Sequence, residues 1–215
     1  MTDVNRTKLY LITPPKLDLA IFPSILERTF DAGDVACIQL RLKDSIEDDI
    51  RQAINILKPI AQDRGIAFLL NDDPLMAAET ACDGVHIGQE DATYFDAREA
   101  VGQNAIVGVT CHASRHLGME AAEKGADYVA FGAFFETKTK IPKHYANFEI
   151  LKWWCEDMTV PAIAIGGITL NNCRPLISTG VDFLAISSGI WDYPAGPVEA
   201  VKAFNNICRE ATLSY

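Results

Sequence analysis

Cationic side chains alternate with apolar ones in one short segment, VACIQLRLKD, which has the pattern of a β-strand. Successive side chains of a strand point to opposite faces, so Gln39, Arg41 and Lys43 share one face and the other face is apolar. A buried cation needs an anionic partner. The segment therefore predicts an anion-binding site, and the alternative is the solvated face of an edge strand.

Carboxylates follow the next two apolar runs. IAFLLNDD places Asn71 and Asp72 where hydrophobicity stops, and GVHIGQED places Asp91 after the following run. Two convergent carboxylates, completed by water and substrate phosphate oxygens, suit Mg²⁺. The spacing leaves a second interpretation open, in which Asp72 and Asp73 cap one helix and Asp91 caps the next.

Hydroxyl, ammonium and glycine residues follow the last three apolar runs, in the segments FFETKTK, AIAIGGIT and FLAISSGI. Such groups bind phosphate oxygens, through side chains or through exposed backbone N–H groups. Taken alone, paired glycines and paired serines also occur in ordinary turns. The candidate phosphate-binding residues are Thr137, Thr139, Lys140, Gly167, Ser187 and Ser188.

Short apolar runs alternate with helical segments as far as the C-terminus. Eight such strand and helix pairs predict an α/β protein with one TIM (β/α)₈ barrel domain over residues 1–215, its ligands at the carboxyl ends of the strands. An open doubly wound sheet is the runner-up, but LYLITPPKLD has prolines where that fold usually has glycines. The predicted strands are Lys8–Thr13, Val35–Leu42, Ile66–Asn71, Gly84–Gly88, Ile106–Cys111, Tyr128–Phe134, Ala162–Gly166 and Phe183–Ser187.

Composition limits the partners and the cellular location that the protein can have. The chain has 215 residues and a formal net charge of −10, which argues against nucleic acid as a partner because that binding depends on basic side chains. The six cysteines are dispersed without a C-x-x-C pair, so we expect reduced thiols in the core. The sequence shows no signal peptide pattern and no long apolar span. We therefore expect a cytoplasmic protein without a membrane partner.

Two histidines and a pair of adjacent tryptophans are expected to have structural roles rather than roles in the chemistry. His86 and His112 have the intrinsic pKa of an acid–base catalyst, but we expect structural roles for both. Trp153 and Trp154 lie at helical spacing with Leu151, which predicts packing of a helix on the barrel or a contact within a homo-oligomer.

Taken together, QLRLKD, NDD, DGVHIGQED, GADYVAFGAFFETKTK, AIGGIT and AISSGI resemble the thiamine-phosphate synthase family over nearly the whole chain. The resemblance implies a Mg²⁺-dependent transferase that joins hydroxymethylpyrimidine diphosphate to thiazole phosphate and releases pyrophosphate. On the pyrimidine diphosphate side it implies Gln39, Arg41, Lys43, Asn71 and Lys140, with Asp72 and Asp91 binding Mg²⁺. On the thiazole phosphate side it implies Thr137, Thr139, Gly167, Ser187 and Ser188.

The resemblance also implies the course of the reaction. Arg41, Lys43 and Lys140 would stabilise the departing pyrophosphate in a dissociative displacement, and no protein nucleophile is needed. Thr110 would contact substrate where the family usually has serine, which keeps the hydroxyl and adds a methyl group.

Two departures and two rival functions accompany the resemblance. Ala133 replaces a proline common in the sixth-strand motif, and the segment after Lys140 is short. A related thiazole tautomerase has a catalytic histidine where this chain has Ala133. A paralogue that binds thiazole or thiamine phosphates without turnover is the other alternative, although it would not need Asp72, Asp91 and Lys140.

Overall fold

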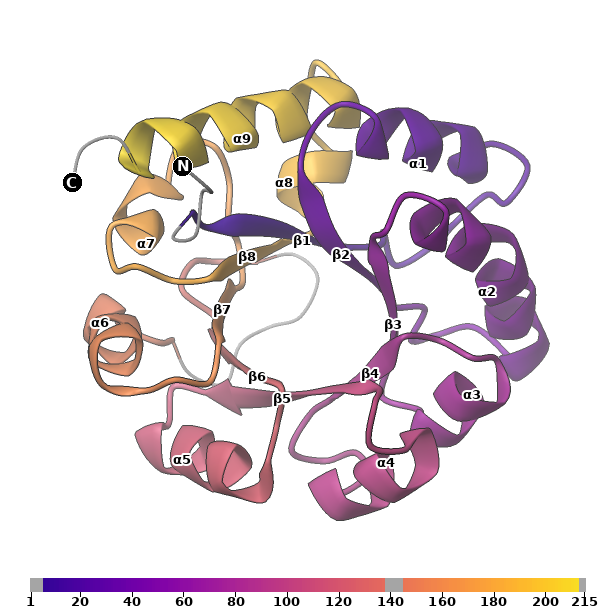
Figure 1. Ribbon diagram of the computed structural model, residues 1–215. Helices are drawn as coiled ribbons and strands as arrows, with labels where there is room; N and C mark the ends of the chain where they lie inside the picture. Colours follow the sequence, from indigo (N-terminus) through magenta and orange to yellow (C-terminus); the bar gives the residue numbers. More distant parts are fainter. Residues whose placement is uncertain (1–5, 138–144, 213–215) are drawn as a thin grey trace.

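The computed structural model describes residues 6–137 and 145–212, which form a ring of parallel strands surrounded by helices (Figure 1). The strands are β1 (Lys8–Ile12), β2 (Val35–Leu40), β3 (Ala67–Asn71), β4 (Gly84–Ile87), β5 (Ile106–His112), β6 (Tyr128–Gly132), β7 (Ala162–Ile165) and β8 (Phe183–Ile186). The helices are α1 (Phe22–Phe30), α2 (Glu47–Gln62), α3 (Pro74–Glu79), α4 (Tyr94–Val101), α5 (Arg115–Lys124), α6 (Phe148–Asp157), α7 (Arg174–Ile177), α8 (Ser188–Trp191) and α9 (Pro197–Thr212).

The barrel is closed, because each strand pairs in parallel with the next and β8 pairs with β1. This closure confirms the predicted TIM barrel and rules out the open doubly wound sheet, in which the first and last strands would not pair. Since the strands are parallel, all their carboxyl ends open on one face of the ring. We call this face the barrel mouth.

Alternation along each strand divides the buried side chains into two layers. Ile38 and Leu40 are fully buried between the strands and the surrounding helices, in the larger apolar layer. Gln39 and Cys37 face the interior of the barrel, where Cys37 packs with Tyr10 and other inward-facing residues. The two faces predicted for the QLRLKD segment are therefore confirmed for the part that lies in β2.

Two strands end two residues earlier than predicted, and the other boundaries agree or differ by one residue. β2 ends at Leu40 rather than Leu42. The N–H of Arg41 donates to the side-chain oxygen Oγ1 of Thr13 at 3.0 Å instead of continuing the strand ladder. β6 ends at Gly132 rather than Phe134. Arg41 and Lys43 therefore lie in the loop after β2, and the alternation of a strand does not position them.

Side-chain caps begin several helices. Asp73 accepts a hydrogen bond from the N–H of Met76 at the start of α3, and Ser114 accepts one at the start of α5. Each cap satisfies a backbone donor that has no partner within the helix. At the other end of α5, Gly125 adopts a positive φ of 100°, which suits glycine.

Packing of α6 on the barrel is also as predicted. Trp154 is 1% exposed, lies edge-on to Phe131 with ring centroids 5.1 Å apart, and donates through Nε1 to the carbonyl of Val160.

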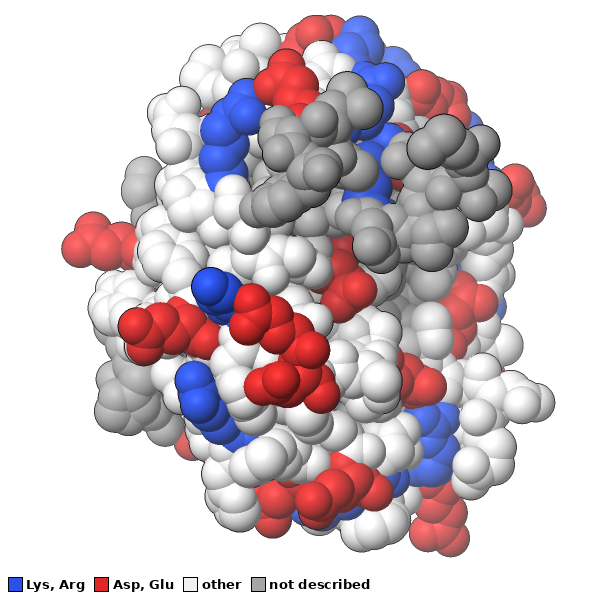
Figure 2. Space-filling view, turned by 60° about the vertical axis from the view of Figure 1, so that its left-hand side comes forward, with Lys and Arg blue, Asp and Glu red and all other residues white. Residues whose placement is uncertain are grey.

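All six cysteines are free thiols, and four of them are buried. Within the described residues, no helix is long and apolar enough to cross a membrane. Figure 2 shows acidic side chains gathered near the middle of one face, with basic ones scattered around them.

Candidate active site at the barrel mouth

Amide side chains meet at the carboxyl ends of β2 and β3. Gln39 is 2% exposed, and its Nε2 donates to Oδ1 of Asn71 at 3.2 Å. Asn71 is the last residue of β3 and is only partly buried. The structure therefore brings these two predicted residues together just inside the mouth, with Asn71 nearer to solvent.

Asp72 and Asp73 have different tasks, although they are adjacent in the chain. Asp73 caps α3, whereas Asp72 has a left-handed backbone with φ of 70° and its N–H donates to the carbonyl of His86. The carboxylate of Asp72 lies 3.4 Å from Nζ of Lys43. The capping interpretation thus holds for Asp73 and is wrong for Asp72, which lies beside a cation at the mouth.

Asp91 lies in the tight turn after β4, where its Oδ2 accepts a hydrogen bond from the N–H of Gly88 at 2.7 Å. A Cβ atom at Gly88 would stand 2.8 Å from that oxygen, so a larger residue there would displace the carboxylate of Asp91. Thr93, not Asp91, caps α4 through the N–H of Asp96. The capping interpretation of Asp91 is therefore also wrong.

The two carboxylates lie next to each other. Burial raises the pKa of Asp72 above its ordinary value, and a hydrogen bond and the negative charge of Asp91 raise it further, while Lys43 opposes this effect. Among the described residues, no group of three or more His, Cys, Asp or Glu side chains is arranged to bind a metal. A pair of carboxylates near a phosphate site suits Mg²⁺, which keeps several waters and takes further oxygens from its substrate.

Arg41 lies among these acidic groups. Burial lowers the pKa of its guanidinium, and the charges of Asp72, Asp44 and Asp91 oppose that shift. A guanidinium stays protonated in proteins, so the side chain is a cation with carboxylates nearby. Sequence reasoning missed Thr13, which holds the backbone of Arg41; its position at the end of the first apolar run was the available signal.

A chain of hydrogen bonds lies beneath this side of the mouth. His86 bonds through Nε2 to Oγ1 of Thr110 at 2.7 Å and through Nδ1 to the hydroxyl of Tyr128 at 2.8 Å. The Tyr128 hydroxyl lies 3.0 Å from that of Tyr10. Burial lowers the pKa of His86 from 6.5 to about 4, so its ring is neutral near pH 7. These contacts agree with the structural role expected for His86, whereas His112 is exposed.

Sequence reasoning missed the part played by Tyr10 and Tyr128. Both face the barrel interior by strand alternation, and that pattern was readable from LYLI and YVAFG. Alternation does not say which inward-facing side chains from different strands touch.

Backbone turns dominate the other side of the mouth. Gly166 and Gly167 follow β7 with positive φ values of 103° and 65°. The carbonyl of Gly166 accepts a hydrogen bond from the N–H of Phe135, and a Cβ at Gly167 would stand 2.2 Å from the carbonyl oxygen of Glu136. The turn after β7 thus packs directly against the segment that leads to Thr137. Thr139 and Lys140 lie outside the described residues.

Ser187 and Ser188 follow β8, and Ser188 begins α8. The hydroxyl of Ser187 donates to the carbonyl of Thr13 at 3.2 Å. Asn172 steadies the turn after β7 by donating to the carbonyl of Gly167 at 2.9 Å. The predicted serines are therefore at the mouth, although the hydroxyl of Ser187 already has an acceptor on Thr13, the residue that follows β1.

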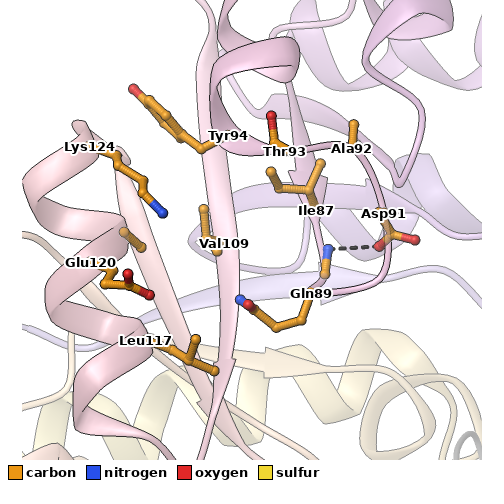
Figure 3. Close-up of a pocket in the computed structure, with 12 residues that line it drawn as sticks. Ile87, Gln89, Asp91, Ala92, Thr93, Tyr94, Val109, Leu117, Glu120 and Lys124 are labelled. Carbon is orange, nitrogen blue, oxygen red and sulfur yellow. Dashed lines mark hydrogen bonds between the residues drawn. The ribbon is translucent and has the colours of Figure 1, made fainter.

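A pocket of about 190 Å³ opens beside the Asp91 turn, between β4, β5, α4 and α5 (Figure 3). Val109 and Leu117 line it with apolar groups, while Glu120 and Lys124 add charges. Val109 belongs to the layer between strands and helices, on the opposite face of β5 from Thr110. The pocket is therefore separate from the barrel interior.

Known proteins share this sequence and fold. The family profile described as thiamine monophosphate synthase matches residues 9–190. A thiamine-phosphate synthase of Rhodospirillum centenum is 56% identical over 97% of this chain and 100% of its own length. Another, from Hyphomonas neptunium, is 46% identical over 93% of each chain. A solved thiamine phosphate pyrophosphorylase from Pyrococcus furiosus superposes with a TM-score of 0.82 at 28% identity, covering 96% of this chain and 98% of its own.

The barrel, the paired carboxylates at its mouth and these full-length similarities agree with one another. Because the family profile covers most of the sequence and the relatives match over nearly their whole length, the chain belongs to the thiamine monophosphate synthase family.

Proposed function

We propose that this protein joins hydroxymethylpyrimidine diphosphate to thiazole phosphate, forming thiamine phosphate and releasing pyrophosphate. The observation that carries the proposal is the charged cluster at the mouth, where Asp72 lies 3.4 Å from Lys43 and beside Asp91. Thiazole tautomerisation and thiazole phosphate binding involve no diphosphate. A cluster of this kind therefore supports the synthase reaction over both rivals.

In this proposal the β2–β4 side holds the pyrimidine diphosphate. Arg41 and Lys43 bind diphosphate oxygens, since both are cations in the loop after β2. Asp72 and Asp91 hold Mg²⁺, which supplies positive charge to the leaving pyrophosphate when it is bound. Gln39 and Asn71 offer amide groups to the polar atoms of the substrate.

Thr110 and Lys140 complete the pyrimidine side. The hydroxyl of Thr110 faces the barrel interior next to His86 and would contact the pyrimidine ring. Lys140 would reach the diphosphate from the segment after β6, as the family resemblance implies.

The β6–β8 side holds the thiazole phosphate in the same proposal. The turn at Gly167 and the start of α8 at Ser188 offer backbone N–H groups, which suit phosphate oxygens. Ser187, Thr137 and Thr139 supply hydroxyls. Loops after the seventh and eighth strands are a frequent phosphate site in this type of barrel.

The reaction needs positioning and electrostatic stabilisation from the protein. The bond between the pyrimidine methylene and the diphosphate oxygen breaks, and its electron pair leaves with pyrophosphate. The amino group of the pyrimidine donates electrons to the methylene carbon, and the thiazole nitrogen then forms the new C–N bond. Arg41, Lys43 and Lys140 stabilise the leaving charge, and the two halves of the mouth align the reactants.

The proposal also concerns where the reaction takes place. Six free thiols suit the reducing conditions of the cytoplasm, so we infer that the enzyme works there.

The direct test mixes both phosphorylated precursors with the purified protein, with and without Mg²⁺, and follows thiamine phosphate. We expect product only when Mg²⁺ and both precursors are present. Binding of thiazole phosphate without any turnover would contradict the proposal and favour the non-catalytic paralogue.

A further inference from the structure

Four side chains form one continuous hydrogen-bonded chain from the barrel interior to the mouth. Tyr10, Tyr128 and His86 are between 3% and 7% exposed, and each hydroxyl or ring nitrogen lies 2.7 to 3.0 Å from the next. Thr110, at the outer end, is only partly buried. The chain therefore connects a group closed off from solvent with one that a ligand can reach.

The barrel makes room for this chain at one glycine. Gly108 lies on β5 between His86 of β4 and Tyr128 of β6 in the strand register. A Cβ atom at Gly108 would stand 1.9 Å from the Cζ atom of Tyr128, which no side chain could tolerate. The missing side chain lets the phenol cross β5 and reach His86. The two rings stack with centroids 5.6 Å apart.

Counting hydrogens leaves two ways to orient the chain. Each tyrosine, the threonine and the neutral imidazole carry one donor hydrogen. In the outward direction, Tyr10 donates to Tyr128, Tyr128 donates to Nδ1 of His86, and Nε2–H donates to Thr110. In the inward direction every bond is reversed. A mixed arrangement, with Tyr128 accepting from both neighbours, leaves its own buried hydrogen without a partner in the chain.

The surroundings of Tyr10, at the buried end of the chain, favour the outward direction. If the chain ran inward, the hydrogen of Tyr10 would be left over in the interior, where the Cys37 thiol is the other hydrogen-bonding neighbour that the described residues provide. Sulfur is a weak acceptor, and a buried donor without a good acceptor is costly. If the chain runs outward, the hydrogen left over is that of Thr110, which lies where a ligand or water can accept it.

We propose that Tyr10, Tyr128 and His86 are positioning residues that hold the Thr110 hydroxyl as a hydrogen-bond donor toward an acceptor atom of the substrate. His86 then carries its hydrogen on Nε2 and donates it to the oxygen of Thr110, so the O–H hydrogen of Thr110 stays available to a ligand.

The inference rests on the proposed function for the identity of the acceptor. An aminopyrimidine ring has bare ring nitrogens that accept hydrogen bonds, beside an amino group that donates them. The O–H group of Thr110 can donate to a ring nitrogen, whereas the amino group could use only the remaining lone pair of a hydroxyl oxygen that already accepts from His86. The buried chain would therefore select the orientation of the ring in its site, and so the direction of the methylene group.

The first test measures the tautomer of His86 directly. ¹⁵N NMR of the wild-type protein labelled at its four histidines distinguishes protonated from bare ring nitrogens. We expect His86 to carry its hydrogen on Nε2, and we expect the Tyr128→Phe variant to show a mixture of both tautomers. A wild-type His86 with its hydrogen on Nδ1 would overturn the proposal, whatever the enzyme's activity.

The second test asks whether Tyr128 acts through Thr110. We expect Thr110→Val to lower kcat/KM for the pyrimidine diphosphate about tenfold, the value of one ordinary hydrogen bond, and Tyr128→Phe to lower it severalfold. We expect no change in KM for the thiazole phosphate. Because the two residues act in one chain, the double variant should be no worse than Thr110→Val alone. Losses that multiply would contradict the proposal.

Two controls separate positioning from general damage. Thr110→Ser keeps the hydroxyl and should restore most of the kcat/KM that Thr110→Val loses. Tyr94→Phe removes a hydroxyl that donates to the carbonyl of Gly125 at 2.7 Å, on α4 and away from the barrel interior. It should leave both kinetic constants and the His86 tautomer unchanged. A wild-type protein that makes no thiamine phosphate would contradict the proposed reaction, yet the tautomer would still decide this inference.

Discussion

Charged side chains line the β2–β4 side of the barrel mouth, whereas backbone turns form the β6–β8 side. On the first side, Asp72 meets Lys43 and Asp91 across loops from three different strands. On the second, positive φ values at Gly166 and Gly167 let the turn after β7 contact the backbone after β6. The difference teaches how each side should respond to mutation. Side-chain groups can be removed while the fold survives, whereas backbone groups can be altered only by disturbing it.

Thr13 joins the two sides at the end of β1. Its Oγ1 accepts from the N–H of Arg41, and its carbonyl accepts from the hydroxyl of Ser187. One residue therefore connects the loop that carries the cations proposed to bind the diphosphate with the loop proposed to hold the second phosphate. This connection keeps the two halves in a fixed relation, which a displacement between two bound substrates requires.

The largest effect should follow removal of a charge from the β2–β4 side. We expect Asp72→Ala to lower kcat by at least about a thousandfold, because electrostatic stabilisation of the leaving group is lost, while thermal stability stays near wild type. Steady-state kinetics and circular dichroism measure both. Asp73→Asn is the matched control, since asparagine also caps helices and Asp73 is engaged at α3. Near-normal turnover by Asp72→Ala would show that Asp72 does not take part in the reaction.

The β2–β4 side should also make stability depend on pH. His86 has a pKa lowered from 6.5 to about 4, so between these values the unfolded chain binds a proton that the folded protein does not. The free energy of unfolding should therefore fall as the pH drops, by about 2 kcal/mol between pH 7 and pH 5. Urea unfolding of the wild type and of His86→Gln measures it. An equal pH dependence in both proteins would show that His86 is not its source.

A smaller effect should follow a methyl group added to the β6–β8 side. Gly167→Ala places Cβ against the carbonyl of Glu136 at a positive φ, so we expect a loss of about 2 kcal/mol of stability and a higher KM for thiazole phosphate. Gly65→Ala is the control, because its φ of 68° is similar and nothing lies within 4 Å. It should cost about 1 kcal/mol and leave KM unchanged. Equal behaviour of the two variants would mean that the contact at Gly167 does not shape the site.

The sequence predicted the barrel and most of its mouth because strand patterning reports which residues stand at carboxyl ends. Asn71, Asp72 and Asp91 were placed correctly for that reason. Spacing could not separate Asp72 from Asp73, because the distinction depends on the left-handed backbone at Asp72, which turns its carboxylate away from α3.

Contacts across the barrel interior were beyond prediction from the sequence. Alternation places Tyr128 and His86 inside, but their meeting depends on the space left at Gly108 on the strand between them. The end of β2 was also misjudged, because the apolar pattern continues through Leu42 while the side chain of Thr13 takes the next backbone hydrogen bond. Both cases depend on residues that are close in space and distant in the chain.

The most direct test of the division of the mouth into two halves is calorimetric titration of each substrate into Asp72→Ala in buffer with Mg²⁺. The proposed arrangement predicts that the affinity for pyrimidine diphosphate falls by about a hundredfold or more, since the variant loses a ligand of the cation. The Kd for thiazole phosphate should change by less than about threefold, because additivity holds for separate sites. If both affinities fell together, the mouth would be one undivided site and its proposed division into two halves would be wrong.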